Sequence, residues 1–350
     1  MNKSIEDLDK EIIALFSERT RLYIEVKKKH LHDSGCAFSA EDIAITSRLI
    51  ETYNKGPVTN AILKKMYKEL ISCSQSLVQP IKVAYLGPVG TFCHIALVEI
   101  FGESIISVSQ NTISDVFHEV EMGRVSFGVV PVENSTEGAV TYTLDELLDT
   151  DLKIVSEKFL RISYSLLSLC EELKGVKKLY SHPQPIAQCK GWIRRNLPNA
   201  EIHYIDSTAQ AAEIATWDKY SAAIASETSA VIYSLRTLAT NIEDSRHNYT
   251  RFLVIGQMDN PPTGRDKTSI VCALKGKDKS GTLYSLLKPF SDAGVNMTKI
   301  ESRPNKKKKW EYNFFIDFNG HQDDRVVKIA LDEMREETQF LKILGSYPAE

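Results

Sequence analysis

The chain has 350 residues, enough for two or three domains that each bury a core. Its net charge of -3 and charged fraction of 25% lack the basic excess typical of proteins that bind nucleic acid or membrane surfaces. The first ten residues lack a signal-peptide apolar segment, no run of 18 apolar residues occurs, and the cysteines show no disulfide or metal-ligand pattern. We therefore expect a cytoplasmic protein with no metal and no cofactor.

The chain opens with apolar residues at helical spacing. One stripe of them would lie on a single helix face, namely Ile5, Leu8, Ile12, Leu15 and Leu22. Turn-forming residues near 33–35 and 56–57 predict three helices, the second at 40–53. We expect an all-α domain at residues 1–78. It would bury its stripe by pairing with a second copy or by packing on the rest of the chain.

After residue 80, buried strands alternate with helical segments, which is typical of an α/β region. We predict a helix around 229–239 and strands at 81–86, 127–132, 178–181, 202–205, 222–225 and 252–255. This α/β region would span residues 81–257. The proline- and glycine-containing segment 258–267 is typical of a linker.

The last part has the order strand, helix, strand, strand, helix, strand. The expected elements are 269–274, 282–293, 297–302, 312–318, 324–337 and 341–346. This order is the ferredoxin-like α+β arrangement, and we assign it to residues 268–347.

Four motifs within the α/β region identify a family. They are Tyr85–Phe92 (YLGPVGTF), Val132–Ser135 (VENS), Tyr180–Gln184 (YSHPQ) and Asn248–Phe252 (NYTRF). In this order they resemble the prephenate dehydratases. The flanking parts are similar to the helical chorismate mutase domain and the regulatory ACT domain of the bacterial P-protein. The resemblance covers nearly the whole chain, and it implies that the α/β region has two lobes like a type II periplasmic binding protein.

The resemblance implies conversion of prephenate to phenylpyruvate, carbon dioxide and water in phenylalanine biosynthesis. The catalytic residues carried over by motif are Asn134, Ser181, Gln188 and Thr250, with Thr250 at the leaving hydroxyl. All four are neutral and polar. Uncharged donors suit a dianion whose charge disperses during the reaction.

Six further residues are candidate substrate contacts. They are Thr91, Glu133, Ser135, Ser207, Thr208 and Arg251, the last being the nearest cation in sequence. Ser207–Thr208 also fits an ordinary helix N-cap. Glu133 has a structural alternative, since a carboxylate would repel a dianionic substrate.

The helical domain matches the mutase family incompletely. Its remaining site residues would be Arg19, Lys28, Asp42 and Ser74. Asn2 and Glu41 stand where the family has arginines that hold the substrate carboxylates. We therefore predict a degenerate mutase site and a dehydratase alone. The alternatives are an active bifunctional enzyme and, from another class, a non-catalytic amino-acid-sensing protein.

The C-terminal domain is expected to regulate the enzyme. By resemblance, two ACT domains pair and bind phenylalanine between them, through Gly281, Thr282, Leu283, Asn296, Glu301, Ser302 and Arg303. The helix start at Thr282 favours a carboxylate, because free backbone N–H groups point from it. We expect a homodimer or a higher homo-oligomer under feedback control by phenylalanine.

Overall fold

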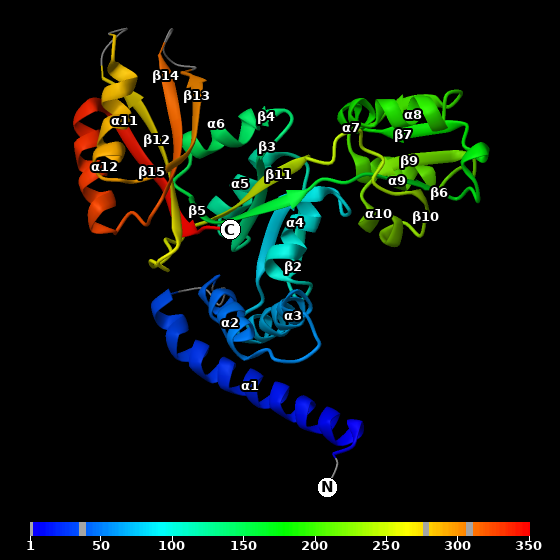
Figure 1. Cartoon of the computed structure of the whole chain (residues 1–350), viewed down its shortest axis with the longest axis horizontal. Coiled ribbons are helices and arrows are strands. Elements are labelled where there is room, and N and C mark those ends of the chain that lie inside the picture. Colours follow the sequence, from blue (N-terminus) through cyan, green and yellow to red (C-terminus); the bar gives the residue numbers. More distant parts are fainter. Residues whose placement is uncertain (1–2, 35–39, 276–279, 306–310) are drawn as a thin grey trace.

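The computed structural model describes residues 3–34, 40–275, 280–305 and 311–350. Figure 1 shows three parts in chain order: a helical part, a central part made of two lobes, and a C-terminal part on the far side of the first lobe. No helix among the described residues is both long and apolar enough to cross a membrane.

The helical part consists of α1 (Ile5–Ser34), α2 (Ala40–Tyr53) and α3 (Asn60–Val78), as the apolar spacing predicts. Helix α3 packs against both α1 and α2. The N-terminal half of α1 extends away from the rest of the chain (Figure 1). Its apolar stripe stays open to solvent, with Ile5 80%, Ile12 46% and Leu15 61% exposed.

The first lobe contains a mixed sheet in the order β2-β1-β3-β11-β5, with the short β4 paired to β3. The strands are β1 (Lys82–Leu86), β2 (Ile106–Gln110), β3 (Phe127–Asn134), β4 (Gly138–Ala139), β5 (Lys153–Arg161) and β11 (Tyr249–Gly256). The helices are α4 (Phe92–Phe101), α5 (Ile113–Glu121) and α6 (Thr141–Asp149). Strand β11 returns from the second lobe and pairs antiparallel with both β3 and β5. It therefore lies in the middle of the first sheet.

The second lobe has its own sheet, in the order β10-β6-β9-β7-β8. The strands are β6 (Ser165–Ser168), β7 (Lys178–Ser181), β8 (Glu201–Tyr204), β9 (Ser221–Ala225) and β10 (Arg236–Ala239). The helices are α7 (Pro183–Gln188), α8 (Lys190–Asn196), α9 (Thr208–Ala215) and α10 (Glu227–Ile232), with a short 3₁₀ turn at Leu173–Gly175. The chain passes between the lobes after β5 and again before β11, which confirms the two-lobed α/β prediction.

The C-terminal part has the predicted βαββαβ order. Its elements are β12 (Asp266–Leu274), α11 (Thr282–Asp292), β13 (Met297–Pro304), β14 (Tyr312–Asn319), α12 (Arg325–Glu337) and β15 (Thr338–Pro348). The sheet order β13-β14-β12-β15 places the first and last strands side by side. Both helices pack against one face of this sheet around Leu286, Phe290 and Met334.

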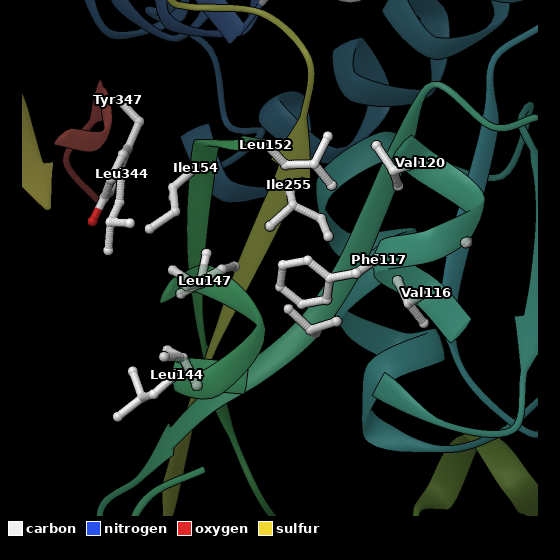
Figure 2. Close-up of a cluster of buried hydrophobic side chains, with 14 of the residues drawn as sticks. Val116, Phe117, Val120, Leu144, Leu147, Leu152, Ile154, Ile255, Leu344 and Tyr347 are labelled. Atoms are coloured by element: carbon white, nitrogen blue, oxygen red, sulfur yellow. The ribbon is translucent and has the colours of Figure 1, made fainter. Parts of the chain in front are cut away.

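The other face of the C-terminal sheet shares a hydrophobic core with the first lobe. Leu344 and Tyr347 of β15 pack in one cluster with Leu144, Leu147 and Ile154 of the lobe (Figure 2). Gly345 allows the close approach, since a Cβ there would lie 2.2 Å from the carbonyl oxygen of Ile154. The two parts are therefore joined by packed apolar side chains.

One local prediction is wrong, and one element boundary differs. The helix expected over 229–239 ends at Ile232, and the chain then forms β10. The segment predicted as a linker is held in place, because Asn260 Nδ2 donates to the carbonyl oxygens of Val155 (2.9 Å) and Ser346 (3.0 Å). Strand β12 also begins earlier than predicted, at Asp266.

Candidate active site

The structure brings together Asn134 and Thr250, which are far apart in sequence. They lie opposite each other at the ends of the antiparallel strands β3 and β11. The Asn134 Nδ2 donates to Thr250 Oγ1 over 2.8 Å, and both side chains are buried. The pairing of the two strands therefore builds this contact.

Backbone N–H groups fix the orientation of the Asn134 amide. Its Oδ1 accepts from the backbone N–H of Thr136 (3.0 Å) and of Glu137 (3.3 Å). The amide NH₂ must then face Thr250 and Asn248, and it also donates to Asn248 Oδ1 over 2.9 Å. Because Thr250 Oγ1 accepts from this NH₂, its own hydrogen is left to donate, and no acceptor for it occurs within the described chain.

The same network continues into the second lobe. Asn248 Nδ2 donates to Gln188 Oε1 over 2.9 Å, and Gln188 Nε2 donates to Thr136 Oγ1 over 3.4 Å. Gln188 ends α7 of the second lobe, whereas Thr136 follows β3 of the first. The network therefore joins the two lobes, and it reaches solvent at the exposed Thr136.

Comparison with known proteins places this arrangement in a family. The model of the prephenate dehydratase family matches residues 83–260, and that of the ACT domain matches residues 270–333. The chain belongs to the prephenate dehydratase family.

Its similarity to individual relatives extends over almost the full length. The bifunctional chorismate mutase/prephenate dehydratase of Aquifex aeolicus is 46% identical, over 99% of this chain and 97% of that protein. The protein of the same description from Stutzerimonas stutzeri is 43% identical, over 98% and 95%. The crystal structure of a prephenate dehydratase from Arthrobacter aurescens in complex with L-Phe has a TM-score of 0.71 at 33% identity, and the match covers 77% of this chain and 90% of that one.

Three of the four residues predicted to be catalytic thus belong to one network in the dehydratase domain. The fourth, Ser181, ends β7 and is fully buried, and its Oγ donates to the carbonyl oxygen of Ile224 over 2.7 Å. It stands just before α7, the helix that carries Gln188. Ser181 supports this end of the second lobe and makes no hydrogen bond to the network in the described chain.

Three predicted substrate contacts lie at helix starts. Thr91 Oγ1 caps α4 by accepting from the His94 N–H, and Ser207 Oγ caps α9 in the same way. Thr208 is the buried first residue of α9. The lobes meet here, since the Gly90 carbonyl oxygen accepts from Ser226 and Ser229 of the second lobe. The structure thus shows Ser207 in the predicted role of a helix N-cap. Thr91 caps a helix of the first lobe and Ser207 caps a helix of the second, which are the two lobes that the network joins.

The prediction that Arg251 is a substrate contact needs correction, because its side chain lies on the opposite face of β11 from Thr250. Its guanidinium is buried against Glu157, Asp317 and Tyr347. Asp317 and Tyr347 belong to the ACT domain. Arg251 therefore faces the ACT domain and is directed away from the network.

Glu133 and Ser135, which flank Asn134, also make structural contacts. Glu133 accepts from Lys299 Nζ of the ACT domain over 2.6 Å, so the structural alternative for this carboxylate is the one observed. Ser135 Oγ donates to the carbonyl oxygen of His247 (3.0 Å) and accepts from the Tyr249 N–H (2.9 Å), which holds the ends of the two strands together.

Two members of the network were not among the predicted site residues. Thr136 directly follows the motif Val132–Ser135, and Asn248 begins the motif that contains Thr250. Their position beside matched residues was the available signal. Next to Gln188, burial raises the pKa of the Cys189 thiol, with added effects of Glu243 and Asp244, so this thiol is not an activated nucleophile.

The helical part contains a cavity of about 600 Å³ at the predicted mutase site. Arg19 lines it, with a guanidinium 5.9 Å from the ring centres of Tyr23 and Tyr67. Asp42 lines it too, and its carboxylate accepts from the Tyr23 hydroxyl over 2.6 Å and pairs with Lys27 at 3.0 Å. Both the guanidinium of Arg19 and the carboxylate of Asp42 therefore belong to residues that line this cavity.

Two predicted mutase residues do not line this cavity. Lys28 is exposed, and its neighbour Lys27 is the cation that pairs with Asp42. Ser74 is fully buried and donates to the carbonyl oxygen of Leu70 over 2.7 Å, which is a contact within α3. Asn2 and the side chain of Glu41 lie outside the described part of the chain.

The predicted phenylalanine site is spread over two elements of the ACT domain. Gly281 precedes α11 in the left-handed conformation (φ 90°), followed by Thr282 and the half-exposed Leu283. Glu301, Ser302 and Arg303 lie on β13, and the backbone of Asn296 binds Asn319 just before this strand. Arg303 is directed at the dehydratase domain, where it holds both carboxylate oxygens of Asp145. The Arg303 guanidinium is thus engaged by Asp145 in this arrangement, and its contact with phenylalanine stays a prediction.

Proposed function

We propose that the network around Thr250 is the site at which prephenate loses its ring carboxylate and hydroxyl to give phenylpyruvate. The observation that carries this proposal is the direction of the hydrogen bonds. Asn134 donates to Thr250 Oγ1, so the Thr250 hydroxyl is turned into a donor. A donor at this point is what the departing hydroxyl of the substrate requires.

The chemistry needs few protein groups. As the bond to the ring carboxylate breaks, its electron pair enters the ring, and the hydroxyl on the opposite carbon leaves with a proton as water. Thr250 would donate a hydrogen bond to that oxygen, and the proton that completes the water molecule would come from solvent. No charged side chain belongs to the network. A cation fixed on the departing carboxylate would stabilise the starting state and slow its loss.

The test is to incubate the purified protein separately with prephenate and with chorismate, and to follow phenylpyruvate by its absorbance. Product from prephenate alone supports a dehydratase with a degenerate mutase site. Product from both substrates supports the bifunctional alternative. A protein that binds prephenate without forming product would be the non-catalytic sensor.

We further propose the boundaries 1–78, 81–257 and 268–347 for the mutase-like, dehydratase and ACT domains. The change from helices to alternating strands after Val78 supports the first boundary. The family matches to residues 83–260 and 270–333 support the others. The last two domains share a hydrophobic core around Tyr347, so the boundary between them separates two folds that remain in contact.

Phenylalanine is proposed as the inhibitory effector, bound where two ACT domains pair. The L-Phe complex of the Arthrobacter aurescens relative supports this assignment. We expect Leu283→Ala to weaken phenylalanine binding about tenfold, since burying a leucine side chain contributes about 1.5–3 kcal/mol. Titration calorimetry on the full chain measures it, with Val326→Ala, at an exposed position of α12 in the same domain, as the control. Equal affinities in the two variants would place the effector elsewhere.

The exposed stripe of α1 is proposed to pair with a second copy of the chain. We expect Ile12→Glu combined with Leu15→Glu to shift the protein from dimer to monomer, because two carboxylates would enter the apolar contact. Sedimentation velocity at micromolar concentration measures the mass. Lys10→Glu on the same helix is the matched charge control, and an unchanged mass in the double variant would assign the dimer to another surface.

A further inference from the structure

The ACT domain binds to the immediate chain neighbours of both Asn134 and Thr250. Lys299 of β13 pairs with Glu133 at 2.6 Å, one residue before Asn134. Asp317 of β14 pairs with Arg251 at 2.5 Å, one residue after Thr250. These two ion pairs connect the regulatory sheet with the two strands that carry the catalytic contact.

The strand register places the two ion pairs next to the catalytic pair in the same way. Thr250 stands opposite Asn134, and Arg251 stands opposite Glu133, in the same antiparallel ladder. Successive side chains of a strand point to opposite faces of the sheet. One face of this two-residue step therefore holds the catalytic pair, and the other holds the two residues bound by the ACT domain.

Burial makes the Arg251 contact difficult to rearrange. The side chains of Arg251, Asp317 and Glu157 are 6%, 9% and 0% exposed. Lys267 of β12 binds the second oxygen of Glu157 at 2.5 Å, and the Tyr347 hydroxyl accepts from Arg251 over 2.8 Å. Moving the ACT sheet without moving β11 would take Asp317 from Arg251 and Lys267 from Glu157, so these two buried charges would keep only each other, which is unfavourable.

Space for a different arrangement exists beside these contacts. A cavity of about 300 Å³ is lined by Glu133, Arg251, Lys299 and Asp317, together with Phe159 and Tyr249. The Lys299–Glu133 pair is less buried than the Arg251 cluster, with side chains 14% and 38% exposed. A substitution can therefore remove the Lys299–Glu133 pair without leaving a cavity or an unpaired charge in the buried interior.

We propose that Glu133 and Arg251 are positioning residues, through which the ACT domain sets the alignment of Asn134 with Thr250. The proposal rests on the catalytic roles proposed for that pair. In this proposal, Lys299 and Asp317 are the ACT-domain residues whose positions affect the dehydratase site, through their ion pairs with Glu133 and Arg251. Neither residue needs to contact the substrate.

A second ion pair between the domains provides the control. Arg303, on the same strand as Lys299, holds Asp145 of α6 at 2.8 Å, with side chains 23% and 24% exposed. This pair joins the same two domains but does not bind β3 or β11. Loss of either pair would loosen the domain contact, whereas only loss of the Lys299 pair would free a catalytic strand.

The experiment compares Lys299→Met, Glu133→Gln, their double variant and Asp145→Asn in the full chain. We expect each of the two single variants to lower kcat for prephenate about tenfold with a smaller change in KM, and the double variant to lose no more than either single one. Asp145→Asn should stay within about twofold of the unchanged chain. Lys299→Arg, which keeps the charge, should recover most of the lost kcat.

The outcomes separate this proposal from the proposed function. Unchanged kcat in Lys299→Met, or an equal loss in Asp145→Asn, would overturn the positioning role while leaving the dehydratase assignment in place. An unsubstituted chain without activity on prephenate would overturn the proposed function itself. Thermal unfolding of each variant shows whether a loss of kcat is a loss of folded protein, and the Lys299→Arg recovery decides the case if stability falls.

Discussion

Thr250→Ala is expected to lower kcat for prephenate by about 10²–10⁴, the usual contribution of a positioned proton donor, with a smaller change in KM. The hydroxyl accepts from Asn134 and therefore offers its hydrogen to the substrate. Its removal would leave the departing hydroxyl without this donor at the point where charge develops. Stopped-flow or steady-state absorbance of phenylpyruvate measures the loss.

Thr250→Ser is the matched control, because it keeps the hydroxyl and the bond from Asn134 while it removes one methyl group. It should retain most of the activity. Near-normal turnover in the alanine variant would remove Thr250 from the mechanism. Equal losses in the serine and alanine variants would show that packing of the methyl group, rather than the donor, is what the reaction needs.

The family motifs predicted three of the five residues of the network, namely Asn134, Gln188 and Thr250. Asn134 and Thr250 were separately assigned to the site, and only the antiparallel pairing of β3 with β11 shows that they touch. The return of β11 from the second lobe to the first sheet is a long-range contact, and residue spacing carries no information about it. Thr136 and Asn248 were missed because they enter through this pairing.

Arg251 was assigned to the site because the strand was expected at 252–255, whereas β11 begins at Tyr249 and includes both Thr250 and Arg251. A residue next to Thr250 on an extended strand must point to the opposite face, so both cannot reach one ligand. Nearness in sequence suggested the cation, but strand alternation excludes it. The partner on that opposite face, the ACT sheet, could not be predicted, because the segment before it has the composition of a linker.

The strands and helices of the ACT domain were predicted to within three residues at each end, whereas β2, β4, β5, β6 and β10 were not predicted. Strand β2 lies at a sheet edge and is largely exposed, so it lacks the apolar run that marks a buried strand. Strand β10 was merged with the preceding helix. Ser234 separates the two with a left-handed backbone (φ 54°), a conformation that serine adopts rarely and that composition does not indicate.

The remaining prediction separates this chain from its bifunctional relatives: chorismate should not be rearranged at a measurable rate above the uncatalysed one. A mutase must hold a dicarboxylate by cations, and Glu41 and Asn2 stand where the family has two of the arginines that do so. Two like charges 4 Å apart repel by about 4 kcal/mol in a partly buried site, which corresponds to roughly a thousandfold in rate. Lys27 is already paired with Asp42 at 3.0 Å, so it does not replace the missing arginines.

The measurement is chorismate disappearance, with prephenate turnover by the same preparation as proof that the protein is folded. Arg19→Met should leave the chorismate rate unchanged, since a site that does not catalyse has nothing to lose. A mutase rate comparable to the dehydratase rate, lost in Arg19→Met, would show that the cavity binds chorismate despite Asn2 and Glu41. In that case cations from a paired second copy would have to complete the site, and the monomer variant Ile12→Glu with Leu15→Glu should then abolish mutase activity while prephenate turnover persists.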